Sequence, residues 1–127
     1  MPTAQEIKVT SLSRMFAACV MLSSLNISSF NTENVTNMQG LFYDCNRLTS
    51  LNLSNFNTSN VKNVEGLFAG CPSLTNLNLT GWDLSSVKTW GSQFTAINAN
   101  LKITCSSQTK DSLIAHNSLL DAVANFN

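Results

Sequence analysis

Cysteine and histidine are the residue types of this chain that could bind a metal ion or form a covalent link. Cys19, Cys45 and Cys71 recur every 26 residues, no Cys-x-x-Cys pair occurs, and the sole histidine is His116. Zinc ligands are usually closely spaced thiols and imidazoles, so this pattern disfavours a metal site. Side chains stacked in parallel register leave their Cβ atoms too far apart for a disulfide. We therefore expect buried free thiols here, and also at Cys105, which falls on a core position.

The acidic residues offer no catalytic arrangement. None recurs beside a serine or histidine in the order of a catalytic triad, and no glycine-rich loop could hold a phosphate. Glu33 and Glu65 fall at different phases of the 26-residue period, so they do not form a column. The acids are Glu6, Glu33, Asp44, Glu65, Asp83, Asp111 and Asp121. We expect solvated surface charges, no catalytic residue, no cofactor and no metal ion, and hence a protein that is not an enzyme.

Composition narrows the classes of partner. Seven basic and seven acidic residues give a net charge of zero, so no basic face is available for nucleic acid or an anionic membrane. Polarity comes instead from 17 Asn, 17 Ser and 12 Thr, a composition common in extracellular bacterial repeat proteins. No apolar run approaches the roughly 20 residues of a membrane span. We expect neither nucleic-acid binding nor membrane insertion.

The elements that position these residues come from an internal repeat. Segments 9–34 and 35–60 share 13 of 26 positions, and segments 35–60 and 61–86 share 12. The columns are Val9, Val35, Val61 and Val87; Phe16, Phe42, Phe68 and Phe94; and Leu25, Leu51, Leu77 and Ile103. A fixed period of this length predicts stacked coils that share one core. We expect a single domain, 1–127, with coils at about 9–34, 35–60, 61–86 and 87–105.

Each coil combines two periodicities. Apolar residues three and four apart between Val35 and Cys45 predict a helical or 3₁₀ arc. Leu51 and Leu53 alternate with polar residues, which predicts a strand with one buried face. The Asn- and Ser-rich stretch 55–60 predicts a turn. The sequence thus predicts an α/β repeat solenoid, a right-handed coil with one parallel sheet and helical arcs opposite it.

These patterns resemble a leucine-rich repeat, and more closely the BspA-like repeats of bacterial surface proteins. The stretches LSSLNISSFNTENVTNMQGLF (22–42) and LTSLNLSNFNTSNVKNVEGLF (48–68) follow that family's L-x-x-L-x-L-S-x-F-x-T-x-x-V-x-x-M pattern. The match runs from about Val9 to about Phe94, with departures at Asp83-Leu84 and Trp90. The resemblance implies adhesion to a protein or glycan partner at the cell surface.

The two ends of the repeat differ. Apolar spacing between Thr109 and Phe126 predicts an amphipathic helix, with Asp111 near its start, in a C-terminal cap at about 106–127. We expect no such cover over the first coil, so Leu12, Met15 and Phe16 form a candidate assembly face. We expect it to be covered by another chain, by a two-fold copy, or by residues of a longer parent protein. The apolar stretch 15–22 aligns with internal repeats, so no signal peptide is visible. We expect an extracellular or cell-surface location, with a virion-associated one as the alternative.

A column of small polar residues lines the outward side of the expected strands. It comprises Ser24, Asn26, Ser28, Ser50, Asn52, Ser54, Asn76, Asn78 and Thr80. On one interpretation these amides and hydroxyls read peptide backbone or sugar hydroxyls; on the other, the asparagines bond to one another along the stack. The first makes the chain a binding or adhesion module. A second function remains open, that of a structural assembly subunit of a fibre, filament or virion appendage.

Overall fold

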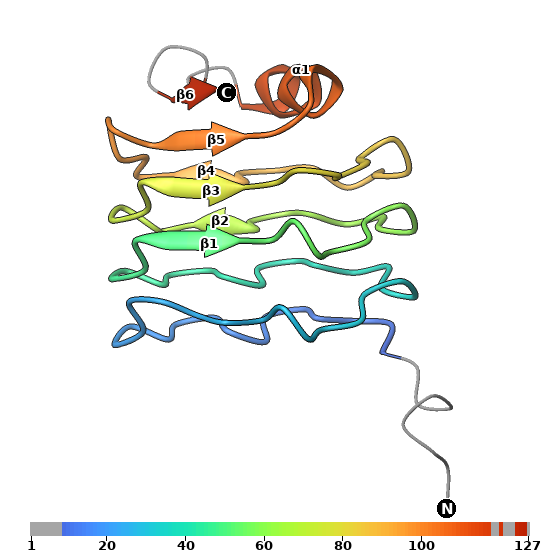
Figure 1. Cartoon of the computed structure of the whole chain (residues 1–127), viewed down its shortest axis with the longest axis horizontal. Helices are drawn as coiled ribbons and strands as arrows, with labels where there is room; N and C mark the ends of the chain where they lie inside the picture. The colour runs from blue at the N-terminus through green and yellow to red at the C-terminus, as the bar shows by residue number, and fades with distance from the viewer. Residues whose placement is uncertain (1–8, 118–119, 121–123, 127) are drawn as a thin grey trace, which may run out of the picture.

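The computed structural model describes residues 9–117, 120 and 124–126, in which successive 26-residue segments lie one above another (Figure 1). The front layer is a parallel sheet in the order β1-β3-β5-β6. Its strands are β1 (Ser50–Asn52), β3 (Asn76–Asn78), β5 (Lys102–Thr104) and β6 (Asn125–Phe126). Between each strand and the next, the chain passes once around the stack, because parallel strands must be joined by a crossover connection.

The register of this sheet follows the repeat. Leu51 lies opposite Leu77, and Leu77 opposite Ile103, as the 26-residue period predicts. The expected first strand at residues 25–27 is absent, however, and the corresponding stretch is irregular. Leu25 has a neighbouring coil on one side only and is half-buried, whereas Leu51 and Leu77 are buried. A strand with one neighbour lacks half of its packing and pairing.

The layer opposite this sheet differs from the one that the sequence predicts. It contains a second parallel sheet, β2 (Phe68–Ala69) with β4 (Phe94–Thr95), so the expectation of one sheet is wrong. A column of single parallel bridges joins this side of all four coils, at Ser11, Asn37, Asn63 and Thr89. The arcs are turns, and residues 9–105 contain no helix; α1 (Ser107–His116) follows the last coil. The expected helical or 3₁₀ arcs are therefore also wrong.

Left-handed backbone explains why the arcs are not helical. Two columns with positive φ run through the arcs at 26-residue intervals. They are Arg14 (58°), Gly40 (59°), Gly66 (64°) and Ser92 (47°), and Ala18 (59°), Asp44 (58°), Gly70 (74°) and Ala96 (54°). A left-handed residue every fourth position breaks a right-handed helix. The apolar spacing of three and four is instead satisfied by tight turns.

The core is one continuous cluster of apolar side chains between the two layers. Phenylalanine rings form its spine, with centroid distances of 5.8 Å between Phe16 and Phe42, 5.9 Å between Phe42 and Phe68, and 5.3 Å between Phe68 and Phe94. A second aromatic pair, Phe56 and Trp82, stacks at 6.5 Å. Stacking identical positions therefore places like side chains in contact from coil to coil.

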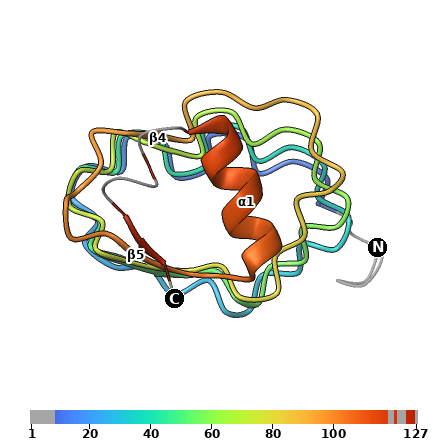
Figure 2. The same cartoon turned by 90° about the horizontal axis from the view of Figure 1, so that it is seen from above.

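The C-terminal cover contains a shorter helix than the sequence predicts. Ser106 caps α1 by accepting a hydrogen bond of 3.2 Å from the Thr109 N–H, and Leu113 is buried beneath the helix. The expectation of one helix over 109–126 is wrong, because β6 pairs in parallel with β5. Asp111 lies beyond the first turn, which contains no acidic residue. Figure 2 shows α1 crossing the end of the stack. No helix among the described residues is long and apolar enough to span a membrane.

Candidate binding face and open end

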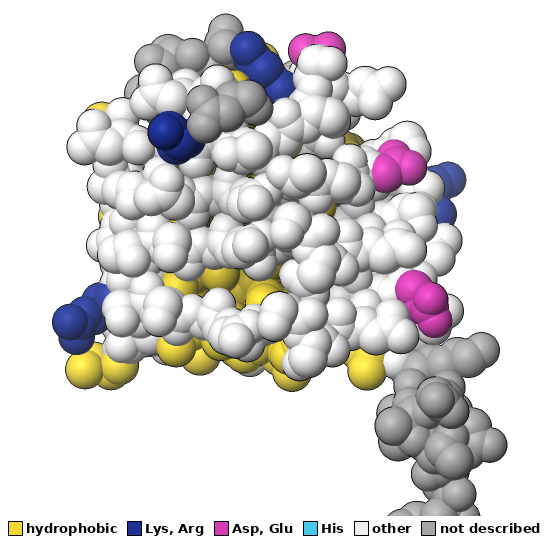
Figure 3. Space-filling model, viewed as in Figure 1, with side chains coloured by type: hydrophobic (Ala, Val, Ile, Leu, Met, Phe, Trp, Pro, Cys, Tyr) yellow, Lys and Arg dark blue, Asp and Glu magenta, His cyan; other side chains and the backbone are white. Residues whose placement is uncertain are grey.

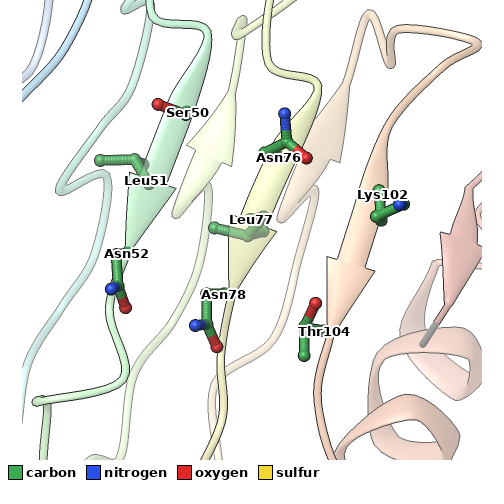
Figure 4. A pocket seen from close by; sticks show the side chains of 8 residues that line it. All are labelled: Ser50, Leu51, Asn52, Asn76, Leu77, Asn78, Lys102 and Thr104. Atoms are coloured by element: carbon green, nitrogen blue, oxygen red, sulfur yellow. The ribbon is translucent and has the colours of Figure 1, made fainter.

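The outward side of the sheet carries two rows of polar side chains (Figure 4). One row is Ser50, Asn76 and Lys102, and the other is Asn52, Asn78 and Thr104. Together with Leu51 and Leu77 they line an open hollow of about 230 Å³. We call this surface the strand face. Because parallel strands lie 4.7–4.9 Å apart, the rows present hydrogen-bonding groups at a fixed repeat.

Local hydrogen bonds fix the asparagines of the strand face. The Oδ1 atom of Asn52 accepts the Ser54 N–H at 3.1 Å and the Ser54 hydroxyl at 2.6 Å. The Oδ1 atom of Asn78 accepts the same groups of Thr80 at 3.0 and 2.6 Å. The asparagines thus bond within their own coil, and the expected bonding along the stack is not what the structure contains. The Nδ2 groups of Asn52 and Asn78 donate to no described residue, so they are available to a ligand.

The nine candidate residues do not all lie on the sheet. Ser24, Asn26 and Ser28 belong to the first coil, which forms no strand, although all three are exposed. The Oδ1 atom of Asn26 still accepts hydrogen bonds from the Ser28 N–H at 3.1 Å and from the Ser28 hydroxyl at 2.8 Å. The turn therefore forms in the first coil although the strand does not. The described strand face therefore begins at the second coil.

Two residues of the strand face were missed in the sequence. Lys102 lies beside Asn76 and Thr104 beside Asn78, one 26-residue period further along. Extending the 26-residue period from Asn76 and Asn78 would have identified both residues. Lys102 is the one charged side chain in the two rows, and Figure 3 shows that this side of the molecule is largely polar and uncharged. The strand face suits ligands that offer hydrogen-bond acceptors.

Cys45 and Cys71 are held as protonated thiols. All four are free; Cys45 and Cys71 are buried, whereas Cys19 and Cys105 are only half-buried, against expectation. Cys19 lies in the first described coil, which has a described neighbouring coil on one side only. Burial raises the pKa of Cys45, and it raises the pKa of Cys71 to about 12. The described residues contain no group of three His, Cys, Asp or Glu that could hold a metal ion.

The end of the stack formed by the first coil is apolar, and we call it the open end. Val9, Met15, Val20 and Met21 are four of the large hydrophobic side chains that are exposed in the described residues. Figure 3 shows hydrophobic side chains gathered along this end. Phe16 is half-buried, whereas Leu12 is buried at 5% exposure. Leu12 therefore belongs to the core cluster and not to the candidate assembly face.

The opposite end is covered by side chains of the cap. The His116 ring stacks on Trp90 with centroids 3.9 Å apart, and Asn117 donates to the side-chain oxygen of Gln93 at 2.8 Å. The Thr109 hydroxyl donates to the Trp82 carbonyl at 3.1 Å. Trp90 and Gln93 occupy positions that hold aliphatic residues in the earlier coils. Because of these two residues, the last coil contacts polar side chains of the cap, where each earlier coil contacts another apolar coil.

Comparison with known proteins gives a family and no activity. The family described as Mycoplasma protein of unknown function, DUF285, matches residues 3–106, and the chain therefore belongs to that family. The match includes residues 9–105, over which the 26-residue segments are stacked, and ends at Ser106, the residue that caps α1. No curated protein and no solved structure matches the chain.

Proposed function

We propose that this chain is a leucine-rich-repeat-like solenoid that acts as a non-enzymatic binding module. Support for the architecture comes from the parallel register of Leu51, Leu77 and Ile103 on successive strands, 26 residues apart. The resemblance to BspA-like repeats supports adhesion at a cell surface. The right-handed sense of the coil and the four-coil division of the single domain are part of the same proposal.

The observation that carries the proposal is the pre-ordered strand face. Asn52 and Asn78 are each fixed by two hydrogen bonds from the Ser or Thr two residues further on, so little entropy of these two side chains remains to be lost on binding. Rows of amide donors and hydroxyls at fixed spacing match the carbonyls of an extended peptide or the hydroxyls of a glycan. The ligand is therefore a protein segment or a sugar chain.

Binding to panels of immobilised oligosaccharides and unstructured peptides tests this function. We expect at least one class to bind the wild-type chain. Asn76→Asp replaces an exposed amide donor of the strand face by an acceptor, and it should weaken binding about tenfold. Gln39→Glu makes the same chemical change on the arc side and should leave binding unchanged. Equal effects of the two variants, or no binding to either panel, would contradict the proposal.

A structural assembly subunit is the second candidate function, and the open end favours it. Met15 is 53% exposed and Met21 is 75% exposed, which is costly in water unless another molecule covers them. An assembly role predicts that the purified chain forms fibres or closed oligomers, which sedimentation velocity would detect. A monomer that binds a panel ligand through Asn76 favours the binding module.

A further inference from the structure

One row of the strand face offers hydrogen-bond donors whose own acceptors are already in use. The Oδ1 atoms of Asn52 and Asn78 each accept two hydrogen bonds from their own coil, which fills both lone pairs of the amide oxygen. Their Nδ2 groups donate to no described residue. A ligand therefore meets amide N–H groups in this row, and these groups require oxygen acceptors.

The other row ends in a positive charge. It runs from Ser50 through Asn76 to Lys102, with one residue on each of β1, β3 and β5. Lys102 is exposed, and no acidic residue of the described part of the chain lines the hollow. An ammonium group provides three donors and no acceptor. The two rows together favour a ligand that is rich in oxygen acceptors and carries a negative charge over β5.

The floor of the hollow is main chain that is already paired. Leu51 and Leu77 lie between the two rows, and their side chains are buried at 3% and 2% exposure (Figure 4). β3 pairs with β1 on one side and with β5 on the other, and β5 also pairs with β6. A peptide that binds as an added strand needs a free strand edge. Contacts over the hollow must therefore come from the side chains of the two rows.

The spacing of the rows distinguishes a peptide from a glycan. Neighbouring strands place equivalent groups about 4.8 Å apart along the stack. An extended peptide laid across the strands repeats the side chains of one face, and the carbonyls of one side, about every 6.6 Å, so its second contact is out of register. A linear chain of pyranose rings advances by close to one strand spacing per ring. Its oxygen atoms therefore meet each strand in turn.

We propose that the strand face binds a linear acidic glycan laid along the stack, with one sugar ring over each of β1, β3 and β5. This inference rests on the binding function proposed above and specifies its class of ligand. Ring hydroxyls accept hydrogen bonds from the Nδ2 groups of Asn52 and Asn78, and the carboxylate of a uronic acid residue pairs with Lys102. Because the two rows lie two residues apart along each strand, they contact opposite edges of each ring.

Binding of short, defined ligands to the full chain tests this class. The probes are the trisaccharide of galacturonic acid, the methyl ester of the same trisaccharide, and the acidic peptide tetraglutamate. The side-chain NH₂ signals of Asn52 and Asn78 in NMR spectra report contact with the strand face. We expect the acidic trisaccharide to shift both signals and to bind about fivefold more tightly than its ester, which keeps the ring hydroxyls and lacks the charge.

The variant Lys102→Gln tests where the charge is bound. It keeps a hydrogen-bonding side chain and removes the positive charge, so it should weaken binding of the acidic trisaccharide about fivefold and leave binding of the ester nearly unchanged. Lys88→Gln is the matched control, because Lys88 is also exposed and precedes the bridge residue Thr89 in the opposite layer. Equal effects of the two variants would mean general attraction between charges and would overturn the proposal.

The length of the glycan tests the direction in which it lies. Affinity should rise from the monosaccharide to the disaccharide and again to the trisaccharide of galacturonic acid, because each added ring reaches another strand. Equal affinities of the three would contradict a glycan laid along the stack.

The outcomes distinguish this ligand from the binding function itself. The acidic glycan is wrong, and the binding module stands, if the trisaccharide does not shift the Asn52 and Asn78 signals while tetraglutamate or another ligand of the panels does. The same holds if the ester binds as tightly as the acid. If none of the oligosaccharides and peptides binds, the proposed function fails as well.

Discussion

The thiols of the second and third coils show how the stack sets the properties of single residues. The Cys45 thiol donates to the Phe16 carbonyl at 3.1 Å, and the Cys71 thiol donates to the Phe42 carbonyl at 3.1 Å. Each cysteine therefore ties its own coil to the one before it. Such a thiol is inert, because the thiolate is the nucleophile and the metal ligand, and burial disfavours the charged form.

Alkaline destabilisation should reveal the Cys71 thiol. Burial raises its pKa from 9.0 to about 12, so the unfolded chain loses this proton at lower pH than the folded chain. Its contribution to stability is complete below pH 9 and is lost between pH 9 and 12, at no more than about 1 kcal/mol per pH unit. Urea unfolding of wild type and Cys71→Ala across this range measures the difference. A wild-type slope equal to that of the variant would show that the thiol ionises freely in the fold.

Among the repeated elements, the phenylalanine column should dominate the stability of the stack. Phe42 is fully buried between two rings, so Phe42→Ala should lower the free energy of unfolding by about 3–5 kcal/mol through cavity formation. Phe16 is half-buried at the open end, and Phe16→Ala should cost about 1–2 kcal/mol. Denaturant unfolding monitored by tryptophan fluorescence compares them. Equal costs would mean that the first coil is as enclosed as the second.

Repetition makes the strand register predictable, because a 26-residue period fixes which residues become neighbours before any conformation is known. Leu51, Leu77 and Ile103 are paired for that reason. The arcs were not predictable from apolar spacing, since tight turns and a helix bury the same residues at intervals of three and four. The tight turns differ from a helix by their left-handed residues. Glycine often marks such a residue in a sequence, but Arg14 and Ala18 adopt positive φ without being glycines.

Some features of the candidate site and of the cap could not be predicted, because they depend on local geometry. Asn52 and Asn78 were found because their column repeats, but the pairing of each with the following Ser or Thr depends on turn geometry. The cap was recognised from its apolar residues, yet its division into α1 and β6 depends on the free edge of β5. An edge strand attracts any segment that can pair with it, whatever the helical spacing of that segment.

On the scale of the whole molecule, the fold is a directional stack with two unlike ends. One end is covered by α1 and β6, and the other exposes apolar side chains. The strand face between them is polar and nearly uncharged. The strand face and the open end can therefore be changed independently of one another in variants.

Scalar couplings across hydrogen bonds, measured by NMR on the isotope-labelled wild-type chain, test the directional stack most directly. They identify which carbonyl each amide bonds. The structure requires couplings from the Gly40 amide to the Glu65 carbonyl and from the Gly66 amide to the Gly91 carbonyl. Couplings of the Gly40 and Gly66 amides to carbonyls of the preceding coil, or within their own coil in a helical pattern, would contradict the stack.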